Sequence, residues 1–302
     1  MDINKLLSNL RIADKDSYQE YYEKRKKIQI VSTHIGPSLN DLLGGGLRTQ
    51  QFYILLAGTG VGKSTTMMQL ALDCKRAGKK AAYVTIDEQN EFEILERMAC
   101  MWLKISYHEY IKSPDDYPNV PEFIINNLLE SITVYFSRDP FKETTKLNAQ
   151  NKVVRVPAEF NEILADMKER EINFLFVDYL NAVAIDKDSY SKLAYLSSEL
   201  KDIAESDNIM IFTAMQTNRE LKKAMKQQDF DATLVDESFM ADSIGPARKC
   251  TTCMSLVKEP NKEYMTLNVF KNRLTGRTGS IKITSEPLSM KLSEICDPEL
   301  GF

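Results

Sequence analysis

The sequence is poor in the residues that mark several protein classes. It has two histidines and five cysteines among 302 residues, and its formal net charge at pH 7 is −4. A structural zinc site takes four ligands, but the pair Cys250 and Cys253 has no second pair and no histidine nearby. We therefore expect reduced thiols, as in a cytosolic protein. Because the net charge is negative, no global field attracts nucleic acid, and any DNA contact must be local.

Long apolar runs are missing as well. The N-terminal stretch MDINKLLSNL has no apolar signal-peptide core. No apolar stretch approaches the roughly 18 residues that a membrane-spanning helix needs. With 43% hydrophobic and 27% charged residues, the composition is that of an ordinary soluble protein with a sizeable core. We expect a cytoplasmic protein with no membrane contact.

From Ile30 onward, short apolar runs alternate with helical patterns, and this alternation predicts βαβ units and a parallel sheet. Late in the chain, β-rich segments follow one another without helices, which predicts antiparallel strands added at the sheet edge. We expect one α/β domain over 31–285, an N-terminal arm over 1–30, a C-terminal tail over 286–302 and a long mobile loop at 139–157. The predicted strands are 51–57, 81–87, 132–137, 173–178, 209–215, 251–259, 263–273 and 279–284, and the predicted helices are 64–78, 90–103, 157–171 and 191–206.

The stretch ILLAGTGVGKSTTMMQL (54–70) predicts a P-loop. An apolar strand leads into a Gly-rich turn whose N–H groups can face phosphate oxygens, followed by a lysine for the β- and γ-phosphates and a hydroxyl for Mg²⁺. The helix that follows adds its dipole. The first position of the motif is alanine instead of glycine. ATP and Mg²⁺ are the expected cofactors, and the predicted nucleotide-binding residues are Ala57, Gly58, Thr59, Gly60, Val61, Gly62, Lys63, Ser64 and Thr65.

Acidic residues at the ends of two other predicted strands complete the expected chemistry. Asp178 ends the apolar run FLFVD, where ligands of open α/β sheets bind, and is the candidate Mg²⁺ ligand together with Ser64. Asp87 and Glu88 follow the strand AAYVTI. Either of them could position the attacking water, and because strand side chains alternate between faces, we expect only one of them to point at the γ-phosphate.

At this point the chain resembles the DnaB-type replicative helicases, especially their phage members, which are built on a RecA-like core. The resemblance covers about residues 31–285 and rests on several segments in the right order. These segments are STHIGPSLNDLLGGGLRTQQFYILLAG, AAYVTIDEQNEFEILERM, FLFVDYLNAV, IMIFTAMQTNRE and VFKNRLTGRTGSIKI. The resemblance implies a RecA-like P-loop NTPase: a central, mostly parallel sheet flanked by helices, with antiparallel C-terminal strands.

The resemblance also implies roles for particular residues. Glu88 is favoured over Asp87 because Arg97 follows it at the family's spacing. Gln216 corresponds to the residue that senses the γ-phosphate. Lys271 and Arg273 correspond to a Lys-x-Arg pair that acts on the ATP of the neighbouring subunit, as an arginine finger does. A finger supplied in trans implies an oligomer, and the family implies a hexameric ring.

Pore loops of the family hold single-stranded DNA, and the matching segment here is SFMADSIGPARK (238–249). Family members often carry an Arg-Glu pair where this chain has Ala241 and Asp242. Backbone N–H groups around Ser243 and Gly245 could still hold a phosphate. A second candidate is the basic segment NRELKKAMKQQ, for which the alternative is a solvated helix face. Its candidate DNA contacts are Arg219, Lys222 and Lys223.

Cellular members carry a large N-terminal domain, whereas only about 30 residues precede the core here. We expect the ring to assemble through the arm or with a collar from another protein. Primase, a helicase loader and a single-strand-binding protein are candidate partners. The sequence thus predicts an ATP-dependent replicative DNA helicase that moves along single-stranded DNA. Two alternatives stay open: a RecA-like recombinase, and a regulatory DNA-dependent ATPase without unwinding activity.

Overall fold

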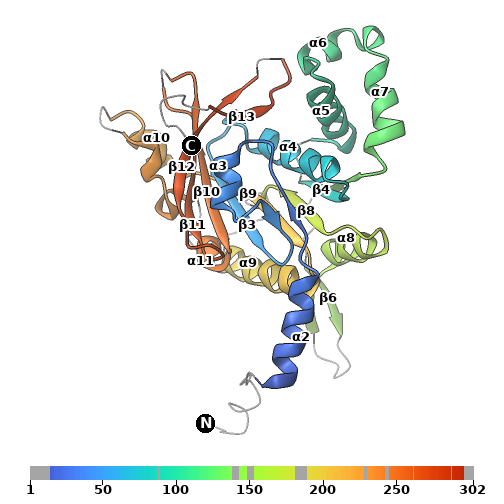
Figure 1. Ribbon diagram of the computed structural model, residues 1–302, viewed down its shortest axis with the longest axis vertical. Helices are drawn as coiled ribbons and strands as arrows, with labels where there is room; N and C mark the ends of the chain where they lie inside the picture. Colours follow the sequence, from blue (N-terminus) through green and yellow to red (C-terminus); the bar gives the residue numbers. More distant parts are fainter. Residues whose placement is uncertain are drawn as a thin grey trace.

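A nine-stranded sheet forms the centre of the fold (Figure 1). This computed structural model describes residues 14–86, 89–137, 143–147, 153–180, 189–227, 230–241, 245–260, 262–286 and 288–295. The strand order is β13-β12-β11-β10-β3-β9-β8-β4-β5. The strands from β10 to β5 in this order run parallel, and β11, β12 and β13 are antiparallel additions, which confirms the predicted mixed sheet. The bounds are β3 (Phe52–Ala57), β4 (Ala81–Ile86), β5 (Ile132–Ser137), β8 (Phe174–Asp178), β9 (Met210–Gln216), β10 (Thr252–Val257), β11 (Met265–Asn272), β12 (Gly279–Ser285) and β13 (Leu292–Glu294).

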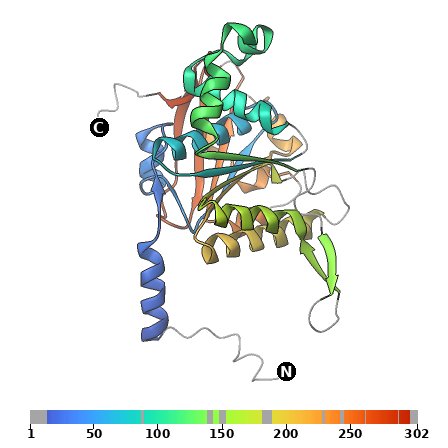
Figure 2. The same cartoon turned by 90° about the vertical axis from the view of Figure 1, so that its right-hand side faces the viewer.

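Helices cover both faces of this sheet, and this explains why the central strands read as continuous apolar runs. In β3, Tyr53 and Leu55 pack on one face and Ile54 and Leu56 on the other, because successive side chains alternate. The first face is covered by α4 (Lys63–Arg76) and α5 (Glu91–Leu103), the second by α8 (Ala158–Glu169) and α9 (Ser189–Ser206). Figure 2 shows the two helical layers edge on.

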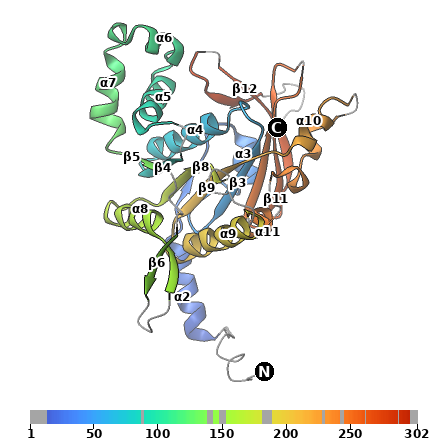
Figure 3. The ribbon, with the colours of Figure 1, turned by 180° about the vertical axis from the view of Figure 1, so that it is seen from behind.

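Smaller elements extend these layers. After α5, a helical lobe at one end of the molecule contains α6 (Tyr107–Lys112), α7 (Asn119–Phe123) and a π-helical turn at Ile124–Leu128 (Figure 3). Near the N-terminus, β1 (Ile30–Val31) pairs with β2 (Leu47–Arg48) around α3 (Pro37–Leu42). Two short helices, α10 (Arg219–Ala224) and α11 (Gly245–Lys249), lie between β9 and β10 in sequence. In the described part of the chain, no helix is both long and apolar enough to cross a bilayer.

The helix α2 (Lys15–Lys26) projects away from the body, as the three ribbon views agree. None of its residues is buried, and Tyr18, Tyr21 and Tyr22 are 65%, 54% and 48% exposed. Its C-terminal end is nevertheless attached: Gln50 Nε2 donates to the Lys24 carbonyl over 3.2 Å, and Asn208 Nδ2 donates to the Lys27 carbonyl over 3.3 Å. The arm therefore leaves the body in a defined direction.

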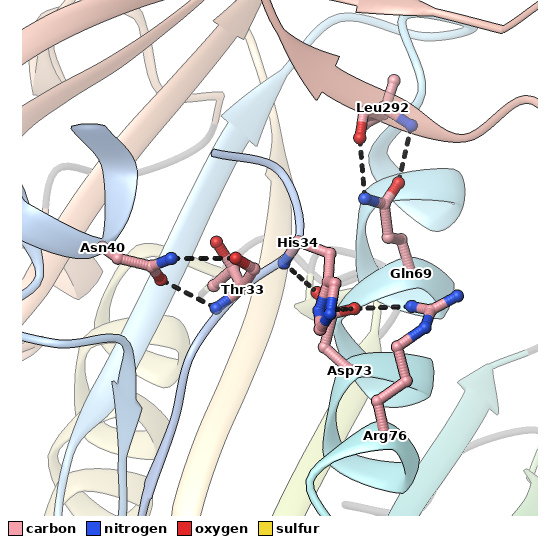
Figure 4. A network of polar contacts seen from close by, with 7 residues as sticks. All are labelled: Thr33, His34, Asn40, Gln69, Asp73, Arg76 and Leu292. Atoms are coloured by element: carbon pink, nitrogen blue, oxygen red, sulfur yellow. Dashed lines mark hydrogen bonds and ion pairs between the residues drawn. The ribbon is translucent and has the colours of Figure 1, made fainter. Parts of the chain in front are cut away.

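Two stretches differ from the sequence-based expectation. Within 139–157, predicted as a loop, β6 (Glu143–Leu147) and β7 (Val153–Pro157) pair as an antiparallel hairpin. Their threonines and valines favour extended backbone. The sheet also continues past residue 285, because β13 pairs with β12 and Gln69 of α4 makes two hydrogen bonds to the backbone of Leu292, at 2.6 and 2.7 Å (Figure 4).

Helix α4 is fixed by a second buried contact (Figure 4). The fully buried carboxylate of Asp73 accepts from the backbone N–H of His34 over 2.9 Å and from Arg76 over 2.7 Å, and it lies 3.1 Å from His34 Nδ1. The helix that begins at the P-loop is thus held at two points, four residues apart on one face.

Candidate nucleotide site

The predicted site residues gather where four parallel strands end side by side. In the order β3, β9, β8, β4, the strands carry the P-loop, Gln216, Asp178 and the Asp87–Glu88 segment at their C-terminal ends. The register places Ala57 beside Gln216, and Asp178 beside Thr85. Ligands of open α/β sheets bind at this edge. Asp87 and Glu88 themselves lie outside the described residues, so the choice between them stays a prediction.

The loop between β3 and α4 has the conformation that a phosphate cradle needs. Gly60 has φ +76° and Gly62 has φ +111°, in the left-handed region that glycine favours. The hydrogen bond from the N–H of Thr66 to the carbonyl of Gly62 closes the first turn of α4. The N–H groups before Thr66 lie outside the i−4 pattern of the helix and point toward the loop. Amides and helix dipole together favour an anion at this position.

Lys63 is the first residue of α4 and is 9% exposed. Its Nζ donates to the carbonyl of Gly58 over 3.3 Å and lies 5.7 Å from the centre of the Tyr179 ring. The ammonium group is thereby held over the Gly-rich turn. An incoming phosphate would meet a positive charge that is already in place.

Asp178 is 6% exposed and ends β8. Phe174 and Phe176 of the same strand pack on the face covered by α4, so alternation places the Asp178 side chain on that face too. The Tyr83 hydroxyl donates to its Oδ2 over 2.7 Å. A buried carboxylate and the Ser64 hydroxyl in the first turn of α4 are the oxygen ligands that Mg²⁺ prefers, so the residues present suit the predicted cofactor.

Gln216 connects this edge to the segment predicted to bind DNA. The Ala241 N–H donates to the Gln216 carbonyl over 2.9 Å, and Thr217 forms an isolated β-bridge with Met240. The Asn218 N–H donates to the Phe239 carbonyl over 2.8 Å. A displacement of the end of β9 would therefore carry residues 239–241 with it. Asp242, Ser243 and Ile244 lie outside the described residues.

The Lys-x-Arg pair lies at the other end of the sheet. Lys271 is in register with Cys253, which pairs with Ile54 of β3. The Arg273 N–H donates to Thr251, whose N–H donates to Phe52 at the start of β3. The five steps from Phe52 to Ala57 span about 16 Å at roughly 3.3 Å per residue. Neither side chain is directed to the P-loop of its own subunit.

Both side chains of this pair contact the C-terminal end of α11. Lys271 Nζ donates to the carbonyls of Ala247 and Cys250, the latter over 3.2 Å, and a guanidinium nitrogen of Arg273 donates to the Arg248 carbonyl over 2.8 Å. These carbonyls form the negative end of the short helix. The two side chains therefore project to the same side.

The candidate DNA-binding residues of α10 are exposed. Arg219, Lys222 and Lys223 lie on the surface around the buried Leu221, and Lys223 forms a 2.8 Å ion pair with Glu220. Gly245 begins α11 and is half-buried. The structure leaves the DNA contacts as predictions.

Two tyrosines that contact Asp178 and Lys63 were not predicted as site residues. Tyr83 lies in the middle of an apolar strand, which predicts a core residue. Tyr179 follows Asp178 directly, and its position in the sequence predicts no role of its own. The Tyr83 hydroxyl reaches Asp178 through the pairing of β4 with β8, and the ring of Tyr179, directly after β8, lies 5.7 Å from Lys63 Nζ. The contact between Tyr83 and Asp178 had one signal in the sequence: a tyrosine within a strand that neighbours the strand ending in Asp178.

The chain is similar to known proteins in its sequence profile and in its fold. The profile of the DnaB-like helicase C-terminal domain matches residues 32–293. One solved structure, an ATPase domain, superposes with a TM-score of 0.71 at 13% identity, covering 95% of this chain and 100% of that chain. A DnaB-like replicative helicase, solved in a study of its interactions with primase, gives a TM-score of 0.69 at 13% identity over 94% of this chain and 67% of that chain. These two matches confirm the predicted RecA-like fold.

Proposed function

The chain belongs to the DnaB-like helicase family, and from this premise we propose how it couples ATP to movement on DNA. It is an ATP-dependent replicative helicase of that family. We propose that it works in the cytoplasm as a ring, with six subunits as the family suggests, and that ATP is hydrolysed between neighbouring subunits. The ring would move along single-stranded DNA and exclude the other strand.

The position of the Lys-x-Arg pair carries this proposal. Lys271 and Arg273 lie at the end of the sheet opposite the P-loop of their own subunit. A head-to-tail arrangement brings that end of one subunit to the P-loop of the next. There the two cations would leave the α11 carbonyls and stabilise the negative charge that develops on the transferred phosphoryl group. The exposed tyrosines of α2 offer a second surface for contact between subunits.

The remaining residues act within one subunit. The amides before Thr66 and the Lys63 ammonium would bind and orient the phosphates. Ser64 and Asp178 would hold Mg²⁺, which when bound neutralises charge on the β- and γ-phosphates. Glu88, or Asp87 in its place, would orient the attacking water. Gln216 would pass the presence of the γ-phosphate to residues 239–241 through its backbone contact with Ala241.

DNA would be held by the segment after Ala241 and by α10. Arg219, Lys222 and Lys223 supply charge for phosphates, and Ser243 and Gly245 supply backbone N–H groups. Because these contacts are repeated around a ring, DNA binding should be tight and should weaken steeply with salt, although the net charge of the protein is negative. The DnaB-like helicase with structural similarity was solved in a study of its interactions with primase, and we propose primase, a loader or a single-strand-binding protein as partners here.

The proposal is tested by unwinding of a forked DNA substrate with ATP and Mg²⁺. Lys63→Ala should abolish ATP hydrolysis and strand displacement while the protein stays folded. Lys168→Ala, an exposed lysine of α8, is the matched control and should behave as wild type. Normal ATP hydrolysis in Lys63→Ala would mean that the proposed nucleotide site is wrong. ATP hydrolysis without strand displacement, with primase and loader added, would favour a regulatory ATPase, and helical filaments in electron micrographs would favour a recombinase.

A further inference from the structure

The hydroxyl of Tyr83 touches the residue proposed to hold the metal. Tyr83 lies in β4, is 0% exposed and donates its hydroxyl hydrogen to Asp178 Oδ2 over 2.7 Å. We propose that Tyr83 is a positioning residue that orients Asp178 toward Mg²⁺. The inference rests on the proposed function of Asp178 as a metal ligand and deepens it.

Strand register explains how the contact forms. Tyr83 pairs with Phe176 of β8, two residues before Asp178, and both Tyr83 and Phe176 pack on the face covered by α4. The long phenol ring reaches from this level to the end of β8, where the shorter side chain of Asp178 turns toward the P-loop helix. The two residues are 95 positions apart in sequence, and the parallel pairing of β4 with β8 alone brings them together.

The chemistry of the donor suits a metal site. A carboxylate bound at one oxygen by a fixed donor presents its other oxygen in a defined direction, and partners of this kind orient ligands around bound metals. A phenol is uncharged, so it holds the carboxylate without neutralising the negative charge that attracts Mg²⁺. A lysine or arginine in the same place would compete with the cation for that charge.

The same contact has a simpler interpretation, since a buried tyrosine hydroxyl usually finds some hydrogen-bond partner. The chain offers a matched example of this kind. Tyr53 of β3 is 1% exposed, packs on the same face and accepts a hydrogen bond from the Arg48 backbone N–H over 3.1 Å. Its hydroxyl contacts Arg48 of β2, and Tyr53 stands near the start of β3, whereas the P-loop follows the end of that strand. Tyr53→Phe therefore removes the same atom from the same core without touching the metal position.

The experiment measures Mn²⁺ binding to the full-length protein with ADP present, by electron paramagnetic resonance, so that no turnover is needed. Tyr83→Phe should raise the dissociation constant of Mn²⁺ about tenfold or more. ADP binding in EDTA should stay unchanged, because the phosphate amides and Lys63 are intact. Tyr53→Phe should bind Mn²⁺ as wild type does. Urea unfolding, run first on both variants, compares their stabilities and establishes that each is folded.

Asp178→Asn separates failure of the inference from failure of the site. If Asp178→Asn weakens Mn²⁺ binding and Tyr83→Phe does not, Tyr83 is only a core residue and the inference is overturned. If Asp178→Asn also binds Mn²⁺ normally, the proposed metal ligand itself is wrong. Equal weakening in Tyr83→Phe and Tyr53→Phe would likewise overturn the positioning role, since it would trace to general loss of stability.

Discussion

Replacement of Gln69 by leucine tests how strongly the C-terminal strand holds the P-loop helix. Gln69 is 1% exposed, and its amide donates to the Leu292 carbonyl over 2.7 Å and accepts from the Leu292 N–H over 2.6 Å. Leucine keeps the volume but leaves both backbone groups of a 1% exposed residue without these partners. Each unsatisfied buried group costs about 1–3 kcal/mol. We expect Gln69→Leu to lower the free energy of unfolding by about 2–4 kcal/mol, because the short β13 can relax toward water.

Urea unfolding followed by circular dichroism measures this change as a shift of the midpoint at constant slope. Gln227→Leu is the control, because Gln227 is an exposed glutamine after α10, and a surface change of this kind stays within about 0.5 kcal/mol. A loss of less than about 0.5 kcal/mol in Gln69→Leu would refute the reasoning. It would mean that Gln69 does not hold β13 against α4.

Three further predictions concern buried contacts. In Gly36→Ala, the new Cβ would overlap Oε2 and Cβ of Glu294 and lie 2.9 Å from its Cδ, so thermal unfolding should move to clearly lower temperature, and an unchanged midpoint would contradict the close packing. Burial raises the pKa of the Asp73 carboxyl, although the nearby His34 and Arg76 act to lower it. The protonated carboxyl therefore stabilises the folded state fully below about pH 4, and this stabilisation is lost as the pH rises through the raised pKa of the folded state. Asp73→Asn should remove that part of the stability–pH curve, and a superimposable curve would argue against it. Burial also raises the pKa of the Cys100 thiol to about 12, so maleimide at pH 8 should label it only after unfolding, as mass spectrometry can show.

Strands buried on both faces were readable from the sequence, because such strands are continuous apolar runs between turn signals. The predicted strand at 173–178 is observed as Phe174–Asp178, and that at 51–57 as Phe52–Ala57. The hairpin β6–β7 was not predicted, since the threonines and lysine of its first strand show no apolar alternation. Nor was β13, whose three residues depend on Gln69 and on β12 for their pairing.

The candidate site was predictable to a similar extent. The P-loop and Asp178 could be placed because each stands at the end of a strand of recognisable pattern, and parallel strands end at one edge, whereas Gln216 was named from the family resemblance. The side-chain contacts could not be placed, because they depend on strand register between distant segments. Tyr83 reaches Asp178 across 95 residues of sequence. The direction of Lys271 and Arg273 toward α11 likewise depends on the pairing of β11 with β10.

The central claim is that each ATP site is shared between two subunits, and one mixing experiment tests it most directly. Lys63→Ala lacks the P-loop lysine but keeps the Lys-x-Arg pair, whereas Arg273→Ala keeps the P-loop and lacks the finger. Each variant alone should hydrolyse almost no ATP. In rings assembled from equal amounts of both, about one quarter of the interfaces should combine an intact P-loop with an intact finger, and ATPase activity should return to about that fraction of wild type. If the mixture stays as inactive as its components while co-assembly is verified by pull-down of a tagged subunit, hydrolysis does not occur between subunits and the account is wrong.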